Sequence, residues 1–252
     1  MEGVSSPCFG TRAAGGAETT PSPIAFLSPF LLFSPTSVFT QLGSTAIGVK
    51  TAEGVVLAVE KRVTSPLLLP ASIEKISEVD THVAAAVSGL TADARTLVDH
   101  GRVQAQQHRF SYNEPMPVES VTQSLCDLAL RFGEDDDEGG GGGGMARPFG
   151  VALLLAGWDP DAGPCLFQTD PSGTFVAYGA RAIGSGAEGA QTALQEAYRP
   201  DLSLAEAEVV ALATLKQVME EKVTPTNVSL ATVAPAYKLY TPDEVKAVIE
   251  RL

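Results

Sequence analysis

Residues 42–62 read LGSTAIGVKTAEGVVLAVEKR, and this stretch decides the fold of the chain. Two runs rich in Val, Ile, Leu, Thr and Ala, 44–51 and 55–61, flank Ala52-Glu53-Gly54. The pattern predicts a β-hairpin in which Gly54 supplies the positive φ of a tight reversal.

The ends of this hairpin carry groups that suggest chemistry. Ser44 opens it and Glu60-Lys61-Arg62 closes it, which puts a hydroxyl near one end and three charges at the other end of the same sheet. This combination makes the hairpin a candidate active site, which the rest of the sequence must support or exclude.

Composition limits the classes of protein to which the chain can belong. With 252 residues, 44% of them hydrophobic, it can bury well over half of its unfolded surface and form one large domain or two small ones. The net charge of −13 argues against DNA or RNA as a partner, because a phosphate backbone repels an acidic surface.

Cysteines and histidines give no sign of disulfides or metal. They are Cys8, Cys126 and Cys165, and His82, His100 and His108. Three scattered cysteines fit reduced thiols in the cytosol or nucleus, and neither residue type has metal-ligand spacing. We expect no metal and no cofactor.

The first 41 residues differ in composition from residues 42–252. They are rich in Ser, Pro, Gly and Thr, and four prolines between 21 and 35 interrupt any regular element. The apolar run 24–33 is about half the roughly 20 residues that a membrane helix needs. As a signal-peptide core it lacks a basic n-region and contains a proline, so we expect a disordered leader and no membrane partner.

Beyond the hairpin, hydrophobic periodicity predicts groups of strands separated by pairs of helices. In chain order these are strands at 73–80 and 82–88, helices at 90–110 and 118–132, strands at 151–156, 165–170 and 174–180, helices at 185–198 and 203–222, strands at 228–233 and 237–240, and a short terminal helix. Such grouping predicts an α+β layered domain, whereas a parallel sheet would alternate strand and helix.

Cap and loop signals support these boundaries. Ser185/Glu188 and Ser203/Glu206 have the spacing of capping boxes, and Thr241-Pro242 caps the terminal helix. Residues 134–146 hold an acidic run followed by six glycines, which predicts a flexible solvated loop. A cation site there is conceivable, but nothing in the sequence shapes one.

The run Gly184-Ser-Gly186-Ala-Glu-Gly189 matches the dinucleotide pattern GxGxxG at a strand-to-helix junction. Here, however, the helix is followed by another helix, so no second parallel strand is expected. We interpret the glycines as permitting close packing of helix on sheet, and nucleotide binding through Gly184–Gly189 is the alternative.

Seven motifs occur in order along the chain. They are Leu42-Gly-Ser-Thr-Ala-Ile-Gly48, Glu60-Lys-Arg62, Ser72-Ile-Glu-Lys-Ile76, Ser88-Gly-Leu-Thr-Ala-Asp-Ala-Arg95, Arg147-Pro-Phe-Gly150, Asp170-Pro-Ser-Gly173 and Ala182-Ile-Gly-Ser-Gly186. Together they resemble the alpha-type subunits of the proteasome core particle, most closely the type-5 group, over residues 42–252. The resemblance implies the Ntn-hydrolase fold, a four-layer αββα sandwich of two antiparallel sheets between helix layers.

The resemblance also bears on the hairpin. In the catalytic beta-type subunits of this family, a Thr that begins the mature chain attacks the peptide while its α-amino group, with a pKa of about 8, helps to take the proton. The resemblance places Ser44 at that position, and Glu60, Arg62 and Lys75 where the beta type has Asp, Arg and Lys. A long segment precedes Ser44, so its nitrogen is an amide, and losing general-base help costs roughly 10²–10⁴ in rate.

We therefore expect a degenerate site at Ser44, Glu60 and Arg62. The alternative is an autoprocessed hydrolase that uses Ser44 after cleavage of the Gly43-Ser44 bond.

A second role is implied for Lys75. In alpha rings the equivalent lysine lines a pocket between subunits and holds the C-terminal carboxylate of an activator, and Gly43, Gly89 and Leu90 match other parts of that pocket. A Lys paired with a carboxylate in a half-desolvated cleft can anchor a chain end. The simpler interpretation of the sequence by itself is a solvated strand lysine.

The resemblance thus implies a non-catalytic alpha-ring subunit with roles in ring assembly, gating and activator docking during ubiquitin-dependent protein degradation. Implied partners are the other alpha subunits of a heptameric ring, the beta ring, and regulatory-particle ATPases or other activators, in cytoplasm and nucleus. Alpha subunits normally begin with a segment of the form YDR…FSPxGRLFQVEYA that forms a helix across the ring. Only Phe33-Ser-Pro35 resembles it, so we expect residues 1–41 to be a divergent leader from an alternative or mispredicted first exon.

Overall fold

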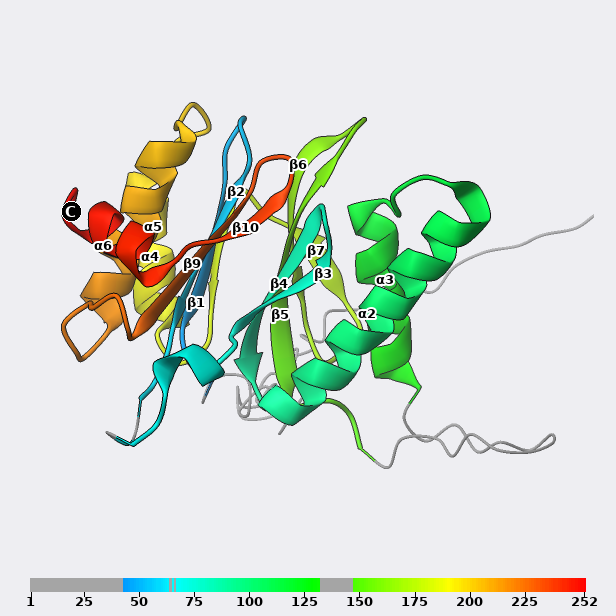
Figure 1. The fold of residues 1–252 in the computed structure, drawn as a ribbon, viewed down its shortest axis with the longest axis horizontal. Helices are drawn as coiled ribbons and strands as arrows, with labels where there is room; N and C mark the ends of the chain where they lie inside the picture. Colours follow the sequence, from blue (N-terminus) through cyan, green and yellow to red (C-terminus); the bar gives the residue numbers. More distant parts are fainter. Residues whose placement is uncertain (1–42, 64, 66, 132–146) are drawn as a thin grey trace, which may run out of the picture. The chain divides into compact units, whose positions relative to one another are not determined.

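The computed structural model describes residues 43–63, 65, 67–131 and 147–252 (Figure 1). The predictions for residues 1–41 and for the loop 134–146 lie outside the described residues and stay predictions. Among the described residues, no helix combines the length and apolar character that crossing a membrane requires.

The predicted hairpin lies at the centre of the first of two five-stranded sheets, whose order is β10-β9-β2-β1-β8. Its strands are β1 (Ala46–Lys50), β2 (Val55–Glu60), β8 (Ala180–Ile183), β9 (Val228–Val233) and β10 (Tyr237–Leu239). All neighbours pair antiparallel, with Ala46 opposite Val59 and Lys50 opposite Val55 in the hairpin.

The second sheet has the order β3-β4-β5-β6-β7 and is also antiparallel throughout. Its strands are β3 (Ile76–Asp80), β4 (Val83–Gly89), β5 (Val151–Asp159), β6 (Gly163–Thr169) and β7 (Phe175–Ala177). The predicted apolar strand after His82 is β4, and its residues are buried on both faces.

Helices cover the outer face of each sheet (Figure 1). They are α2 (Thr91–Tyr112) and α3 (Val118–Leu130) on the second sheet, and α4 (Ala187–Ala197), α5 (Leu204–Val218) and α6 (Pro242–Ile249) on the first, with a 3₁₀ turn η2 at Pro70–Ser72. A third apolar cluster fills the space between the two sheets. The described part of the chain is therefore the predicted four-layer αββα sandwich.

Strand alternation explains why the hairpin is apolar on both faces. Successive side chains of a strand point to opposite faces. In β1, Ile47 and Val49 pack against the helices, whereas Ala46 packs between the sheets. At Gly48 an added Cβ would lie 2.8 Å from Leu166 Cδ1 of the other sheet, so glycine permits that close approach.

Three local predictions were wrong. Gly54 does not adopt a positive φ. Its turn is organised by Thr51 Oγ1, which accepts from the amides of Glu53 and Gly54, both at 3.2 Å. Glycine is needed because an added Cβ would lie 2.5 Å from Ala234 Cβ.

The predicted strand 174–180 is divided between the two sheets, as β7 and β8. The predicted capping box at Ser185 is also absent, because α4 begins at Ala187 and its N-cap residue is Gly186, with no side-chain cap. The capping box at Ser203 and the cap at Thr241 are confirmed, and Thr241 forms a capping box with Glu244.

Candidate functional site

Ser44 lies just before β1 and is buried, with 5% of its surface exposed. Its Oγ has no hydrogen-bond partner among the described residues, while its carbonyl accepts from Ser88 Oγ at 3.0 Å. Gly43 precedes it, and the Gly43 carbonyl accepts from the Ser185 amide at 3.0 Å. The Ser44 nitrogen is thus a peptide amide in a segment that the fold holds.

Glu60 and Arg62 are occupied with other partners. Glu60 Oε2 accepts from the Thr45 amide at 3.2 Å, and its Oε1 pairs with Arg62 Nε at 3.3 Å. Arg62 Nη2 donates to Ser185 Oγ at 2.6 Å. The structure therefore brings Ser44, Glu60 and Arg62 to one end of the hairpin, but Glu60 contacts the residue after Ser44 and not the Ser44 hydroxyl.

The glycine-rich loop before α4 closes over this end. Gly184 has a φ of +97°, and an added Cβ would lie 2.4 Å from the Ser44 carbonyl oxygen. At Gly186 an added Cβ would overlap Val218 of α5, while at Gly189 it would make an ordinary 3.8 Å contact. Gly184 and Gly186 thus permit close packing, against the Ser44 backbone and against α5. The strand before this loop, β8, runs antiparallel to its neighbour β1.

Lys75 lies just before β3, where its carbonyl accepts from the Val87 amide at 3.0 Å. Burial lowers the pKa of its ammonium group, the nearby Arg62 lowers that pKa further, and Glu60 opposes both. Removing water from an ammonium group disfavours its charged form, and so does a second cation nearby. A carboxylate close to this ammonium would oppose both effects, because an opposite charge favours the charged form.

Gly89 ends β4, the strand whose Val87 pairs with Lys75, and Leu90 and Gly43 lie next to Gly89. An added Cβ at Gly43 would lie 2.4 Å from the Gly89 nitrogen, so the two glycines let their backbones meet. Gly89 has a φ of +121°, and Leu90, half exposed, precedes the first turn of α2. The Leu90 amide donates to the Gly150 carbonyl at 3.1 Å. Gly43 thus contacts Gly89 directly. Lys75 is connected to Gly89 only through the hydrogen bond between its carbonyl and Val87 of β4.

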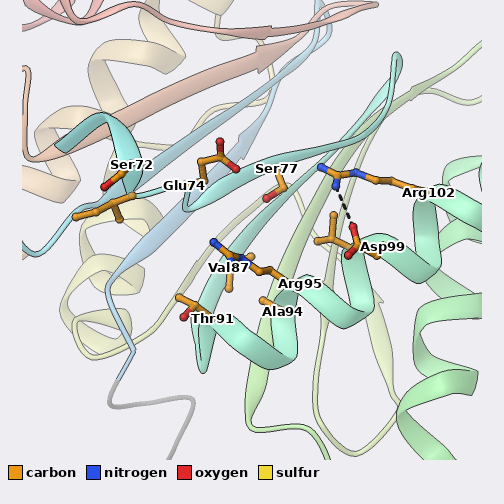
Figure 2. Close-up of a pocket in the computed structure, with 11 residues that line it drawn as sticks. Ser72, Glu74, Ser77, Val87, Thr91, Ala94, Arg95, Asp99 and Arg102 are labelled. Carbon is orange, nitrogen blue, oxygen red and sulfur yellow. Dashed lines mark hydrogen bonds and ion pairs between the residues drawn. The ribbon is translucent and has the colours of Figure 1, made fainter. Parts of the chain in front are cut away.

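Two cavities lie nearby, and Lys75, Gly43, Gly89 and Leu90 are not among the residues that line either of them. One of about 620 Å³ is lined by Thr45, Glu60, Arg62 and Ser185, and by Glu220 and Glu221 after α5. The other, about 370 Å³, lies between residues 72–77 and α2 (Figure 2). In Figure 2 Arg95 extends from α2 into this space, and Arg102 pairs with Asp99 at 3.0 Å.

Asp93 is the residue of this region that the sequence interpretation missed. It lies in the first turn of α2 and is 8% exposed. Arg147 donates to both of its oxygens, Nη1 to Oδ2 at 2.8 Å and Nη2 to Oδ1 at 2.9 Å, and the Gly150 amide donates to Oδ2 at 3.0 Å. Both Asp93 and Arg147 fall within quoted motifs, 88–95 and 147–150, but no local pattern shows that residues 54 positions apart meet.

These contacts limit the chemistry at the Ser44 end. A serine nucleophile needs a base within hydrogen-bond reach, and Ser44 Oγ has no hydrogen-bond partner among the described residues. Its nitrogen, as an amide, cannot serve as that base. In the part of the chain that the structure describes, no group of three or more His, Cys, Asp or Glu side chains is arranged to hold a metal ion.

Comparison with known proteins is consistent with this geometry. A family model described as "Proteasome subunit" matches residues 40–233. The chain is 58% identical to proteasome subunit alpha type-5 of Dictyostelium discoideum over 209 residues, which cover 82% of this chain and 86% of that protein. It is 54% identical both to the probable alpha type-5 subunit of Schizosaccharomyces pombe, covering 84% and 85% of the two chains, and to alpha type-5 of Drosophila melanogaster, covering 84% and 87%. The family resemblance and the sandwich fold predicted from the sequence are confirmed, and the chain belongs to the proteasome subunit family.

Proposed function

We propose that this chain is a non-catalytic alpha-ring subunit of the proteasome core particle, with a degenerate hydrolase site. The observation that carries the proposal is the state of Ser44, whose nitrogen is an internal amide and whose hydroxyl has no hydrogen-bond partner among the described residues. The names of the similar proteins, alpha type-5 subunits, support the same assignment.

The proposed partners are the other alpha subunits of a seven-membered ring, the subunits of the beta ring, and activators such as regulatory-particle ATPases. The proposed roles are ring assembly, gating and activator docking in ubiquitin-dependent protein degradation. We place the chain in the cytoplasm and nucleus, which imaging of a fluorescent fusion that assembles into core particles would test.

Activator docking is proposed to use Lys75 as the cation for a C-terminal carboxylate, with Gly43, Gly89 and Leu90 as the neighbouring backbone. Half-burial of the Lys75 ammonium favours this role, because an ion pair is stronger where water is partly removed. Arg62 and Glu60 lie close enough to shift the pKa of Lys75, so the Lys75 ammonium interacts electrostatically with charged residues near Ser44.

Lys75→Met in assembled core particles tests this role. A fluorescent activator-tail peptide with a free C-terminal carboxylate is titrated by anisotropy, and the same peptide ending in an amide serves as the ligand control. We expect at least a roughly tenfold loss of affinity for the carboxylate peptide and little change for the amide. Lys216→Met, at an exposed lysine of α5, is the matched control and should leave both affinities unchanged.

The pH dependence sharpens the same test. Because the Lys75 pKa lies below its usual 10.5, wild-type affinity for the carboxylate peptide should fall as pH rises through that lowered pKa, where the ammonium loses its charge. Lys75→Met should remove this dependence. Equal affinities of wild type and Lys75→Met at all pH values would show that the pocket lies elsewhere.

The catalytic alternative predicts a different chain terminus. An autoprocessed hydrolase would carry Ser44 as its first residue, and N-terminal sequencing of the chain from purified core particles distinguishes the two. We expect no chain that begins at Ser44.

A further inference from the structure

Asp93 joins three segments at the Ser44 end. It belongs to α2, its carboxylate holds Arg147 in a two-point ion pair, and the same carboxylate accepts the Gly150 amide. The Arg147 hydrogen bonds lower the pKa of Asp93, and the Gly150 amide adds to that effect, whereas burial opposes it. The carboxylate is therefore ionised at neutral pH and holds its partners through charge-assisted hydrogen bonds.

Gly150 passes this constraint to the Gly89-Leu90 backbone, at the end of the strand whose Val87 pairs with Lys75. Its amide is held by Asp93, and its carbonyl accepts the Leu90 amide at 3.1 Å. The same carbonyl would lie 2.4 Å from a Cβ at Gly89, so these backbones are in direct contact. Gly89 in turn meets Gly43.

Hydrogen bonds thus connect the buried Asp93 carboxylate, through Gly150, to the Gly89-Leu90 backbone of the proposed docking pocket. Leu90 immediately precedes α2 and Asp93 lies in its first turn, and Gly150 is bonded to both, at the Asp93 side chain and the Leu90 amide. If the Gly150 amide lost its acceptor, the segment 147–150 and the Gly89-Leu90 backbone would lose their common anchor.

We propose that Asp93 is a positioning residue for docking of a chain-terminal carboxylate at Lys75, acting through Gly150 on the Gly89-Leu90 backbone. The proposal rests on the proposed function, since it assumes that Lys75 receives the carboxylate. Arg147 supports Asp93 by fixing the orientation of its carboxylate. Asp93 itself does not touch the ligand.

Asp80 and Arg109 provide a matched control at the other end of α2. Asp80 is buried, and Arg109 Nη2 donates to both of its oxygens, at 3.0 and 2.9 Å. Arg109 lies 16 residues after Asp93, or about 24 Å along the helix at 1.5 Å per residue. Breaking this pair disturbs α2 to a comparable degree without reaching Gly150.

The experiment uses core particles assembled with Asp93→Ala, Arg147→Met, Asp80→Ala or Arg109→Met. For each, binding of the carboxylate peptide is titrated by anisotropy, and the thermal midpoint and assembly state are measured in parallel. Asp93→Ala is expected to weaken binding roughly tenfold, because it leaves the Gly150 amide without its charged acceptor. Arg147→Met keeps the Gly150 bond and is expected to weaken binding only about threefold.

The controls separate positioning from general destabilisation. Asp80→Ala and Arg109→Met should lower the thermal midpoint comparably yet leave the dissociation constant of the peptide within about twofold of wild type. The positioning role is overturned if Asp93→Ala binds the peptide as wild type does, or if the Asp80 and Asp93 variants weaken binding equally.

Lys75→Met distinguishes this failure from failure of the proposed function. If Lys75→Met weakens binding at least roughly tenfold and Asp93→Ala binds the peptide as wild type does, only the positioning role is wrong. If Lys75→Met has no effect, the pocket assignment itself is wrong. If Asp93→Ala fails to assemble, the peptide affinities of Arg147→Met and Arg109→Met are compared instead. Equal affinities of these two variants would overturn the positioning role.

Discussion

Two buried aspartates each pair with an arginine near the two ends of helix α2, but they fix different kinds of neighbour. One end of the sandwich contains Ser44, Glu60 and Gly150 and is called the Ser44 end. There the Asp93 carboxylate accepts from the amide of Gly150, which lies 57 positions away in the chain. The opposite end contains the turn of the hairpin at Gly54 and is called the hairpin end. There Asp80 accepts a hydrogen bond from the amide of the adjacent Thr81 at 2.8 Å and pairs with Arg109.

The two ends differ in how far along the chain the hydrogen-bond partners of their turns and loops lie. At the hairpin end Thr51 Oγ1 accepts from two amides of its own turn, although Glu53 of that turn also accepts from the distant Leu204 amide at 2.9 Å. At the Ser44 end the backbone depends on distant partners, such as Ser185 for Gly43. A site built from segments far apart in sequence is positioned only when the whole fold is formed.

The largest effect is expected from Gly89→Ala. The new Cβ would meet the Gly150 carbonyl at 2.4 Å, and a φ of +121° is strained for alanine. Strain and overlap together should reduce the free energy of unfolding by roughly 2–5 kcal/mol, measured by urea unfolding of the full chain. Gly163→Ala, at a φ of +72° with open space around it, controls for strain without overlap and should cost about 1–2 kcal/mol. Equal losses would mean that the contact with Gly150 is unimportant.

Gly54→Ala tests close packing at the hairpin end. Gly54 has no positive φ, so the cost should come only from overlap with Ala234 and the Val233 carbonyl. We expect a loss of about 1–3 kcal/mol in the same unfolding experiment, smaller than for Gly89→Ala. Because the overlap is remote from Lys75, peptide binding by assembled particles should stay unchanged.

Asp93→Asn tests the charge of the Ser44-end pair through pH. The pKa of Asp93 is lowered from its usual 3.8 in the folded chain, so its stabilising contribution is complete above about pH 4 and is lost as pH falls through the folded-state pKa. At pH 7 wild type should be more stable than Asp93→Asn by about 1–2 kcal/mol. The gap should close as pH is lowered below about 4, and a gap independent of pH between about 7 and 2.5 would contradict this account.

The smallest effect is expected from Ser44→Ala. Removing a buried hydroxyl that has no hydrogen-bond partner among the described residues should change the free energy of unfolding by no more than about 0.5 kcal/mol. The peptidase activities of core particles that carry the variant should equal those of wild type. A fall in any peptidase activity, at unchanged assembly, would indicate that Ser44 takes part in chemistry.

Sequence patterns predicted the hairpin, the strand and helix groups, the capping box at Ser203 and the cap at Thr241, because these features depend on residues close in the chain. They missed the division of 174–180 into β7 and β8, since an apolar run does not show that the chain changes sheets. The predicted cap at Ser185 failed for a related reason. Arg62 donates to Ser185 Oγ, and the Gly186 amide takes Thr45 Oγ1 as its acceptor at 3.2 Å, so long-range partners replaced the local one.

The candidate site divides in the same way. The sequence interpretation put the Ser44 hydroxyl near one end of the sheet and the charges of residues 60–62 at the other end, and this was wrong, because the antiparallel register brings both to one end. The roles that the resemblance implies for Ser44, Glu60 and Arg62 stay predictions. Lys75 and Gly89 came from the resemblance, and their roles stay predictions. Asp93 was missed, because nothing local in a helix beginning with Thr-Ala-Asp indicates a carboxylate that holds Arg147 and Gly150.

The central claim, that this chain is a non-catalytic alpha-ring subunit, is tested most directly by electron microscopy of core particles purified through a tag on its C-terminus. We expect seven-fold particles in which density for this chain, including residues on both sides of Ser44, occupies one position of an outer ring. Finding the chain in an inner ring with its first ordered residue at Ser44, or absent from the rings, would contradict the account.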